Sequence, residues 1–148
     1  MHYTQYFTYH VDLLRQFKEN ISQDRLYQVD IDELSDNDQQ FMSTLDKICA
    51  AETYSEEMSE QGQWLVGQIV NGYNHLLIAF SRDLLWFFGG SCLHFMPDQE
   101  IDFYQQLDEL RFAAENQDQP FDFVIAKQFL KDKGVAPPST TPTFTIGQ

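Results

Sequence analysis

Apolar residues recur at helical spacing along residues 65–88, and this pattern constrains the fold more than any other feature of the sequence. The apolar residues that share one face of such a helix are Leu65, Ile69, Tyr73, Leu76 and Phe80. Their separations of three or four positions are those of side chains on the same side of an α-helix. Because Trp64, Ile78 and Trp86 place apolar groups on the other side, neighbours must cover most of the circumference. The sequence therefore predicts a long central helix over about 55–88.

Four other segments have the pattern of amphipathic helices, and they would pack around the central one. They span about 9–20, 36–49, 97–114 and 121–133. Ser35 precedes the second of them as an N-cap, and acidic residues in its first turn suit the positive end of the helix dipole. The predicted fold class is all-α: a single-domain bundle of four to five helices around the central helix.

The glycine pair Gly89-Gly90 follows directly on the apolar residues 84–88. A glycine there suits the left-handed conformation in which many helices end, so the central helix would stop at this point. The alternative is a short β-hairpin near 84–96, in which the residues on either side of the glycines form strands. The helical period continues through Leu84, which favours the helix.

The chain of 148 residues has the length of one domain, and no internal repeat divides it. We expect a helical domain over 1–133, since Lys131, Lys133 and Gly134 supply the basic last turn and the glycine that end helices. Residues 134–148, which hold three Pro and four Thr, are predicted to form an extended Pro/Thr-rich C-terminal tail.

Acidic residues outnumber basic ones by 23 to 9, which gives a formal net charge of −14. Such a charge disfavours direct binding of nucleic acid, whose phosphates proteins neutralise with Lys and Arg. The acid is concentrated in residues 30–60 and 98–122, and these segments would attract a basic protein surface. The alternative is that the acid only keeps the surface solvated. The predicted docking patch consists of Asp30, Asp32, Glu33, Asp36, Asp38, Glu52, Glu56, Glu57 and Glu60.

A polar stripe on the predicted central helix is the candidate wall of a ligand pocket. His75 would share one face of that helix with Gln68, Asn71 and Arg82. The stripe could equally be the hydrogen-bonded or solvated side of the helix. The predicted pocket residues are Trp64, Gln68, Asn71, His75, Arg82, Trp86, Cys92 and His94.

Cys92 and His94 have the spacing of half a metal site, but zinc sites need three or four ligands. The sequence contains no second Cys–His pair, so we expect no metal and no cofactor. A Cys92 nucleophile with His75 or His94 as its base would rest on residue type alone, so no catalytic residue is assigned. The acidic segment that starts at Asp30 resembles a calcium-binding loop. However, Leu34 stands where such a loop needs a ligand, and Ser35 stands where it needs a glycine, so the pattern does not predict a calcium site.

Several features predict a cytoplasmic protein without a membrane segment. Residues 1–18 lack the basic start and the unbroken apolar run of a signal peptide. The uncharged stretch 61–81 contains too many amide side chains for a membrane span. The two thiols, Cys49 and Cys92, do not form a disulfide framework, and we expect both to be reduced.

The sequence thus predicts a soluble, non-catalytic interaction or regulatory module that docks a basic partner. One alternative is a small-molecule- or metal-binding bundle, which would include an enzyme, with its pocket near His75 and His94. The other alternative is a structural subunit of a homo-oligomer, with the aromatic residues Tyr3, Tyr6 and Phe7 as its contact surface.

Overall fold

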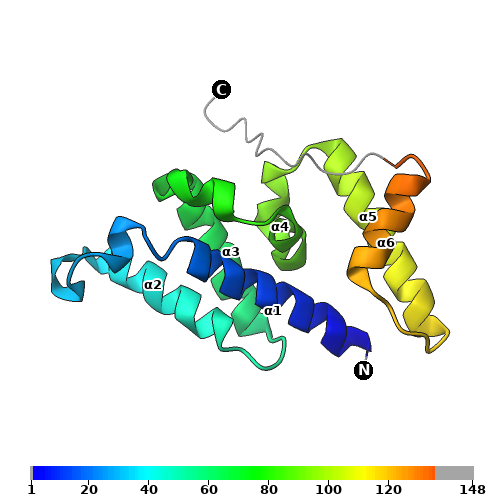
Figure 1. Cartoon of the computed structure of the whole chain (residues 1–148), viewed down its shortest axis with the longest axis horizontal. Helices are drawn as coiled ribbons and strands as arrows, with labels where there is room; N and C mark the ends of the chain where they lie inside the picture. Colours follow the sequence, from blue (N-terminus) through cyan, green and yellow to red (C-terminus); the bar gives the residue numbers. More distant parts are fainter. Residues whose placement is uncertain (1, 136–148) are drawn as a thin grey trace.

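Every regular element among the described residues is a helix, so the predicted all-α, single-domain fold is confirmed (Figure 1). The computed structural model describes the backbone of residues 2–135 and the side chains of residues 5–135. Its α-helices are α1 His2–Asn20, α2 Asp36–Cys49, α3 Glu56–Gly72, α4 Arg82–Phe88, α5 Asp98–Asn116 and α6 Phe123–Asp132. Its short 3₁₀-helices are η1 Arg25–Tyr27, η2 Ile31–Glu33, η3 Asn74–Ala79 and η4 Gly90–Phe95.

The predicted central helix over 55–88 is wrong as one continuous helix, because the structure divides it into α3, η3 and α4. α3 ends at Gly72, and Tyr73 leaves the helical conformation with φ −133° and ψ 40°. α4 starts after Ser81, whose side chain accepts a hydrogen bond from the backbone N–H of Asp83. Glycine is a poor helix former and serine a good N-cap, so both breaks have a local cause. The three pieces direct most of their apolar side chains toward a single core.

The alternative of a β-hairpin near 84–96 is also wrong, because α4 runs to Phe88 and the 3₁₀-helix η4 follows it. Gly89 and Gly90 lie at the junction with φ of 61° and 57°. Glycine adopts such values at the lowest cost of any residue, so the pair ends α4 where the sequence indicated.

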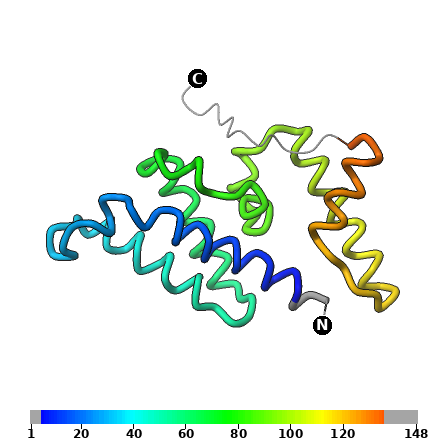
Figure 2. The backbone as a smooth tube through the Cα atoms, in the orientation of Figure 1, coloured from blue at the N-terminus to red at the C-terminus, as the bar shows by residue number. Residues whose placement is uncertain are grey.

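α4 contacts two groups of helices, one that consists of α1, α2 and α3 and one that consists of α5 and α6. α1 lies alongside α2, which packs against α3, and α4 contacts both α1 and α3 (Figure 1, Figure 2). α5 and α6 form a hairpin beside this group. The shared core contains large, fully buried side chains, among them those of Phe17, Phe41, Phe103 and Tyr104. None of the helices within 2–135 has the length and the hydropathy needed to cross a membrane.

Two of the aromatic residues near the start of α1, which would form the contact surface in the homo-oligomer alternative, pack inside their own chain. Tyr6 and Phe7 are only 8% and 5% exposed, because their rings pack against aromatic rings of the same chain. The side chain of Tyr3 lies outside the described residues. At the other end, α6 stops next to the predicted boundary at 133, and the tail residues 136–148 lie outside the described residues.

Replacing Gly62 with Ala is expected to destabilise the protein by about 1–2 kcal/mol, although alanine is the better helix former. A Cβ at this position of α3 would overlap the buried ring of Phe88 on α4. Gly67→Ala is the matched control on the same helix, since a Cβ there would meet no atom within 4 Å. This control is expected to stabilise the protein by up to about 1 kcal/mol. Urea denaturation measures both, and equal stabilities would contradict the close packing of α3 on α4 at Gly62.

Candidate functional site

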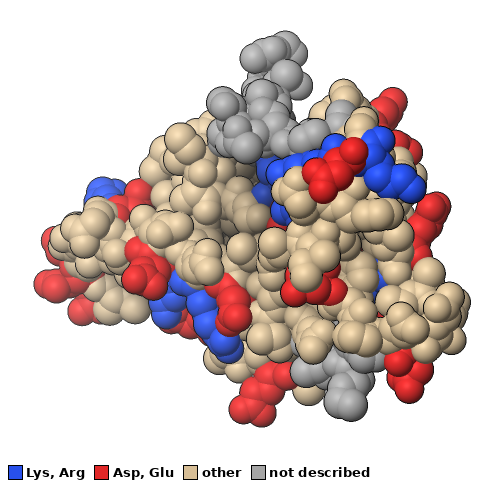
Figure 3. Space-filling model, turned by 45° about the vertical axis from the view of Figure 1, so that its right-hand side comes forward, with Lys and Arg blue, Asp and Glu red and all other residues tan. Residues whose placement is uncertain are grey.

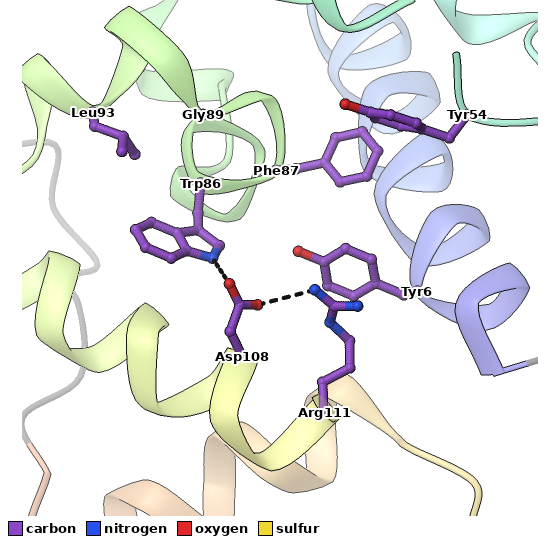
Figure 4. A pocket seen from close by; sticks show the side chains of 8 residues that line it. All are labelled: Tyr6, Tyr54, Trp86, Phe87, Gly89, Leu93, Asp108 and Arg111. Atoms are coloured by element: carbon purple, nitrogen blue, oxygen red, sulfur yellow. Dashed lines mark hydrogen bonds and ion pairs between the residues drawn. The ribbon is translucent and has the colours of Figure 1, made fainter. Parts of the chain in front are cut away.

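A pocket of about 330 Å³ opens between α1, α4, η4, α5 and the loop that joins α2 to α3 (Figure 4). Half of its lining residues are aromatic, and we call it the aromatic pocket. The lining residues are Tyr6, Tyr54, Trp86, Phe87, Gly89, Leu93, Asp108 and Arg111.

The two central walls of the aromatic pocket come from successive residues of α4. Neighbouring residues of a helix point about 100° apart, because a turn contains 3.6 residues. Trp86 therefore faces α5, where its ring stacks on that of Tyr104 with a centroid distance of 5.7 Å. Phe87 faces α1, where its ring centroid lies 5.9 Å from that of Tyr6. The pocket lies between these two directions (Figure 4).

Arg111 supplies the positive charge of the aromatic pocket, and two carboxylates on α5 offset it. Its guanidinium lies 3.3 Å from Asp108 and 3.1 Å from Glu115. It also lies 4.1 Å from the centroid of the Tyr6 ring, in a cation–π contact. The indole N–H of Trp86 donates to the other oxygen of Asp108 at 3.0 Å. The pocket thus combines aromatic faces with a carboxylate that is already held in place by two donors.

A buried carboxylate behind this pocket joins four helices. Asp83, which is 4% exposed, accepts hydrogen bonds from Tyr9 on α1 at 2.6 Å and Tyr104 on α5 at 2.5 Å. The ammonium of Lys127 on α6 lies 3.0 Å from it. Burial alone would raise the pKa of Asp83, but Lys127 and the two phenols together bring that pKa below 3.8. Burial and the same carboxylate raise the pKa of both Tyr9 and Tyr104.

His10 lies against the inner side of two pocket walls. It is 0% exposed, and its ring stacks on that of Phe87 with a centroid distance of 4.5 Å. Its Nδ1 atom lies 2.8 Å from the backbone oxygen of Tyr6, while its Nε2 atom has no hydrogen-bond partner among the described residues. Burial lowers the pKa of His10 from 6.5 to about 4, so the ring is neutral at pH 7.

Of the eight pocket residues that the sequence indicated, Trp86 is the only one that lines the aromatic pocket. The breaks after α3 and η3 separate the residues of the polar stripe, which do not share one helix face. Asn71 is exposed near the end of α3, and the half-buried Gln68 accepts a hydrogen bond from Asn37. Trp64 is half-buried on α3, where it packs against the main core.

The other indicated residues also have separate surroundings. The exposed His75 lies 2.8 Å from Asp24, and Arg82 forms a partly buried ion pair with Glu100. His94 is exposed, whereas Cys92 is buried, and burial raises the pKa of its thiol to about 11. Among the described residues, no three His, Cys, Asp or Glu side chains are grouped so that they could hold a metal.

The acidic docking patch is divided by α2. Its first group, the η2 cluster, consists of the exposed residues Asp30, Asp32, Glu33 and Asp36 at the start of α2. Its second group, which we call the loop cluster, consists of the exposed residues Glu52 on the loop after α2 and Glu56, Glu57 and Glu60 in the first two turns of α3. α2, whose 14 residues span about 21 Å, lies between the two clusters in the chain. Asp38 faces inward and accepts a hydrogen bond from Tyr73 at 2.5 Å.

Sequence reasoning missed Asp83, His10, Lys127 and Arg111 as residues of this region. One signal was available, because Asp83 is the single acidic residue between Glu60 and Asp98. A lone carboxylate in an apolar segment needs a buried partner, but the partner itself cannot be read from the pattern.

A family model described as PA2817-like matches residues 2–137. No curated protein matches the chain. No solved structure matches it either.

Proposed function

We propose that this chain, which belongs to the PA2817-like family, is a non-catalytic binding protein that docks onto a basic protein surface. The exposure of the η2 cluster and the loop cluster is the observation that carries the proposal. No ion pair between described residues uses any of these eight carboxylates. They therefore face solvent, and no basic side chain among the described residues neutralises their charge.

The basic residues do little to offset this negative surface. Six of the nine Lys and Arg side chains form ion pairs with acids of the chain itself. On the face shown in Figure 3, acidic side chains are scattered over the middle and the edges, and basic ones form a few separate groups. Such a surface attracts basic partners and speeds their encounter, while it repels nucleic acid.

The proposal places the protein in the cytoplasm. Cys49 and Cys92 are both free and buried. Burial raises the pKa of each thiol, which keeps both in the neutral, weakly reactive form. Two such thiols are compatible with a reducing compartment, and neither supports a catalytic role.

Binding to a basic partner is expected to weaken at least tenfold between about 50 and 300 mM NaCl, because salt screens exposed charges. A pull-down from native lysate, eluted with increasing salt and identified by mass spectrometry, would supply the partner. Isothermal titration calorimetry with the purified partner then measures the dissociation constant at each salt concentration. A dissociation constant that stays the same across this range would contradict docking by charge.

The two clusters serve as matched controls for each other, since each loses four charges on neutralisation. One variant combines Glu52→Gln, Glu56→Gln, Glu57→Gln and Glu60→Gln. The other combines Asp30→Asn, Asp32→Asn, Glu33→Gln and Asp36→Asn. The cluster that contacts the partner should weaken binding at least about fivefold at low salt when it is neutralised, and the other much less. If neither variant changes the affinity, the clusters are only solvated surface.

A further inference from the structure

We infer that the aromatic pocket binds the side chain of an arginine presented by a basic polypeptide. This inference rests on the proposed function, because it assigns one anchor residue of the partner to one pocket. Three features support it: the aromatic walls, the carboxylates in and around the pocket, and the guanidinium that the pocket already holds.

The walls of the aromatic pocket suit a cation. Figure 4 shows the rings of Tyr6, Trp86 and Phe87 around one space, with Tyr54 at its edge. Aromatic rings attract cations through the negative potential of their faces, and tryptophan is the strongest of them. The volume of about 330 Å³ lies near the lower end of ligand pockets, which fits a single side chain better than a large cofactor.

The charges around the pocket select a cation over an anion. Asp108 lies in the pocket wall, and the exposed Glu52, Glu56 and Glu57 lie within three positions of Tyr54. Three residues of chain span at most about 11 Å, so the α-carbons of these glutamates lie within about that distance of the α-carbon of Tyr54. Arg111 pairs with both Asp108 and Glu115, and two carboxylates against one guanidinium leave this group with a net charge of about −1, which does not attract an anion.

The pocket already shows how a guanidinium fits. Arg111 lies 4.1 Å from the centre of the Tyr6 ring and 3.3 Å from Asp108, which is the combination of ring face and carboxylate that guanidinium groups favour. Tyr104 covers one face of Trp86 and His10 covers one face of Phe87, so a second guanidinium would use the sides of these rings that line the pocket. A planar guanidinium can stack there and donate to Asp108, whereas a lysine ammonium cannot stack.

The test uses short peptides in place of the partner. Gly-Arg-Gly, Gly-Lys-Gly and Gly-citrulline-Gly, all capped at both ends, are titrated into the Trp64→Phe variant. The chain has two Trp, so this change leaves Trp86 as the single tryptophan fluorophore and the single indole N–H signal. We expect the arginine peptide to shift both signals, with a dissociation constant on the order of 1–10 mM at low salt. The lysine peptide should bind more weakly, and the citrulline peptide, which is neutral but has the shape of arginine, at least tenfold more weakly.

Two pocket variants and one control complete the design. Tyr54→Ser removes an exposed ring on a loop, and Asp108→Asn removes the carboxylate charge while it retains an acceptor for Trp86. Each should weaken binding of the arginine peptide at least threefold. Asp102→Asn is the control, because Asp102 is an exposed acid on the same helix and does not line the pocket.

Three results would overturn the inference. They are the absence of any shift up to about 50 mM peptide, equal binding of the arginine and citrulline peptides, and no effect of either pocket variant. If one of these results is found but the whole partner still binds with a steep salt dependence, arginine binding by the pocket is rejected and the proposed docking function is retained. If binding of the partner is independent of salt while the arginine peptide binds, arginine binding by the pocket is retained and docking by charge is rejected.

Discussion

The Asp83→Asn variant is expected to lose about 3 kcal/mol of stability, the lower end of the range for breaking a buried ion pair. The change leaves Lys127 without its partner carboxylate in a mostly buried position. It also weakens the hydrogen bonds that Tyr9 and Tyr104 donate to a charged acceptor. The loss stays near the lower end because the Lys127 side chain is 24% exposed and can reach water.

Urea denaturation at pH 7 measures this loss, and Asp12→Asn is the matched control. Asp12 pairs with Arg15 on α1, but both side chains are more than half exposed. Removal of this exposed pair should cost less than about 1 kcal/mol. If Asp83→Asn were as mild as Asp12→Asn, the buried cluster would not be what holds α6 against α1, α4 and α5.

Wild-type stability is expected to fall by about 3 kcal/mol as the pH decreases from about 6.5 to about 4, because His10 must remain neutral in the folded protein. Burial lowers the pKa of His10 from 6.5 to about 4, an effect larger than the opposing influences of the Tyr6 backbone oxygen and of Asp83. In this window the unfolded chain binds a proton that the folded chain does not, so protonation favours unfolding. Each pH unit of this difference is worth about 1.4 kcal/mol.

The His10→Leu variant tests the assignment, since it removes the titrating group from the buried position. Its stability should change much less between pH 6.5 and 4 than that of the wild type. His75→Gln is the control, because His75 is exposed. A further loss below pH 3.8 is expected in every variant that retains Asp83, whose folded pKa lies below that value. A wild-type stability that is flat from pH 6.5 to 4 would refute the role of His10.

The fold class followed from patterns that act over a few residues. The N-cap at Ser35 is confirmed, since its side chain accepts a hydrogen bond from the backbone N–H of Asp38. The end of α4 at the glycine pair is confirmed by the positive φ of Gly89. The continuity of the central helix was wrong, because apolar periodicity persists across η3 even though the backbone leaves the α-helical conformation at Tyr73.

Much less of the candidate site could be predicted from the sequence. Trp86 was indicated, but as part of a stripe with His75 that exists only if the helix is continuous. Tyr6 and Phe7 would face another copy only in the homo-oligomer alternative; in the structure both rings are buried, Tyr6 against α4 and α6 and Phe7 against α4. Tyr54 and Arg111 carried no local signal, because their role depends on which helices meet at the pocket.

The sequence by itself determined the helical class, the caps and the excess of exposed acid, since these depend on residue type and on neighbours within one or two turns. Only the tertiary structure decided that Lys127 meets Asp83, which is 44 positions earlier in the chain, and that α1, α4 and α5 enclose the aromatic pocket. The physical reason is that helix formation is governed by local hydrogen bonds and side-chain spacing. Contacts between helices depend on how their buried surfaces fill a shared core, which a single periodic pattern does not specify.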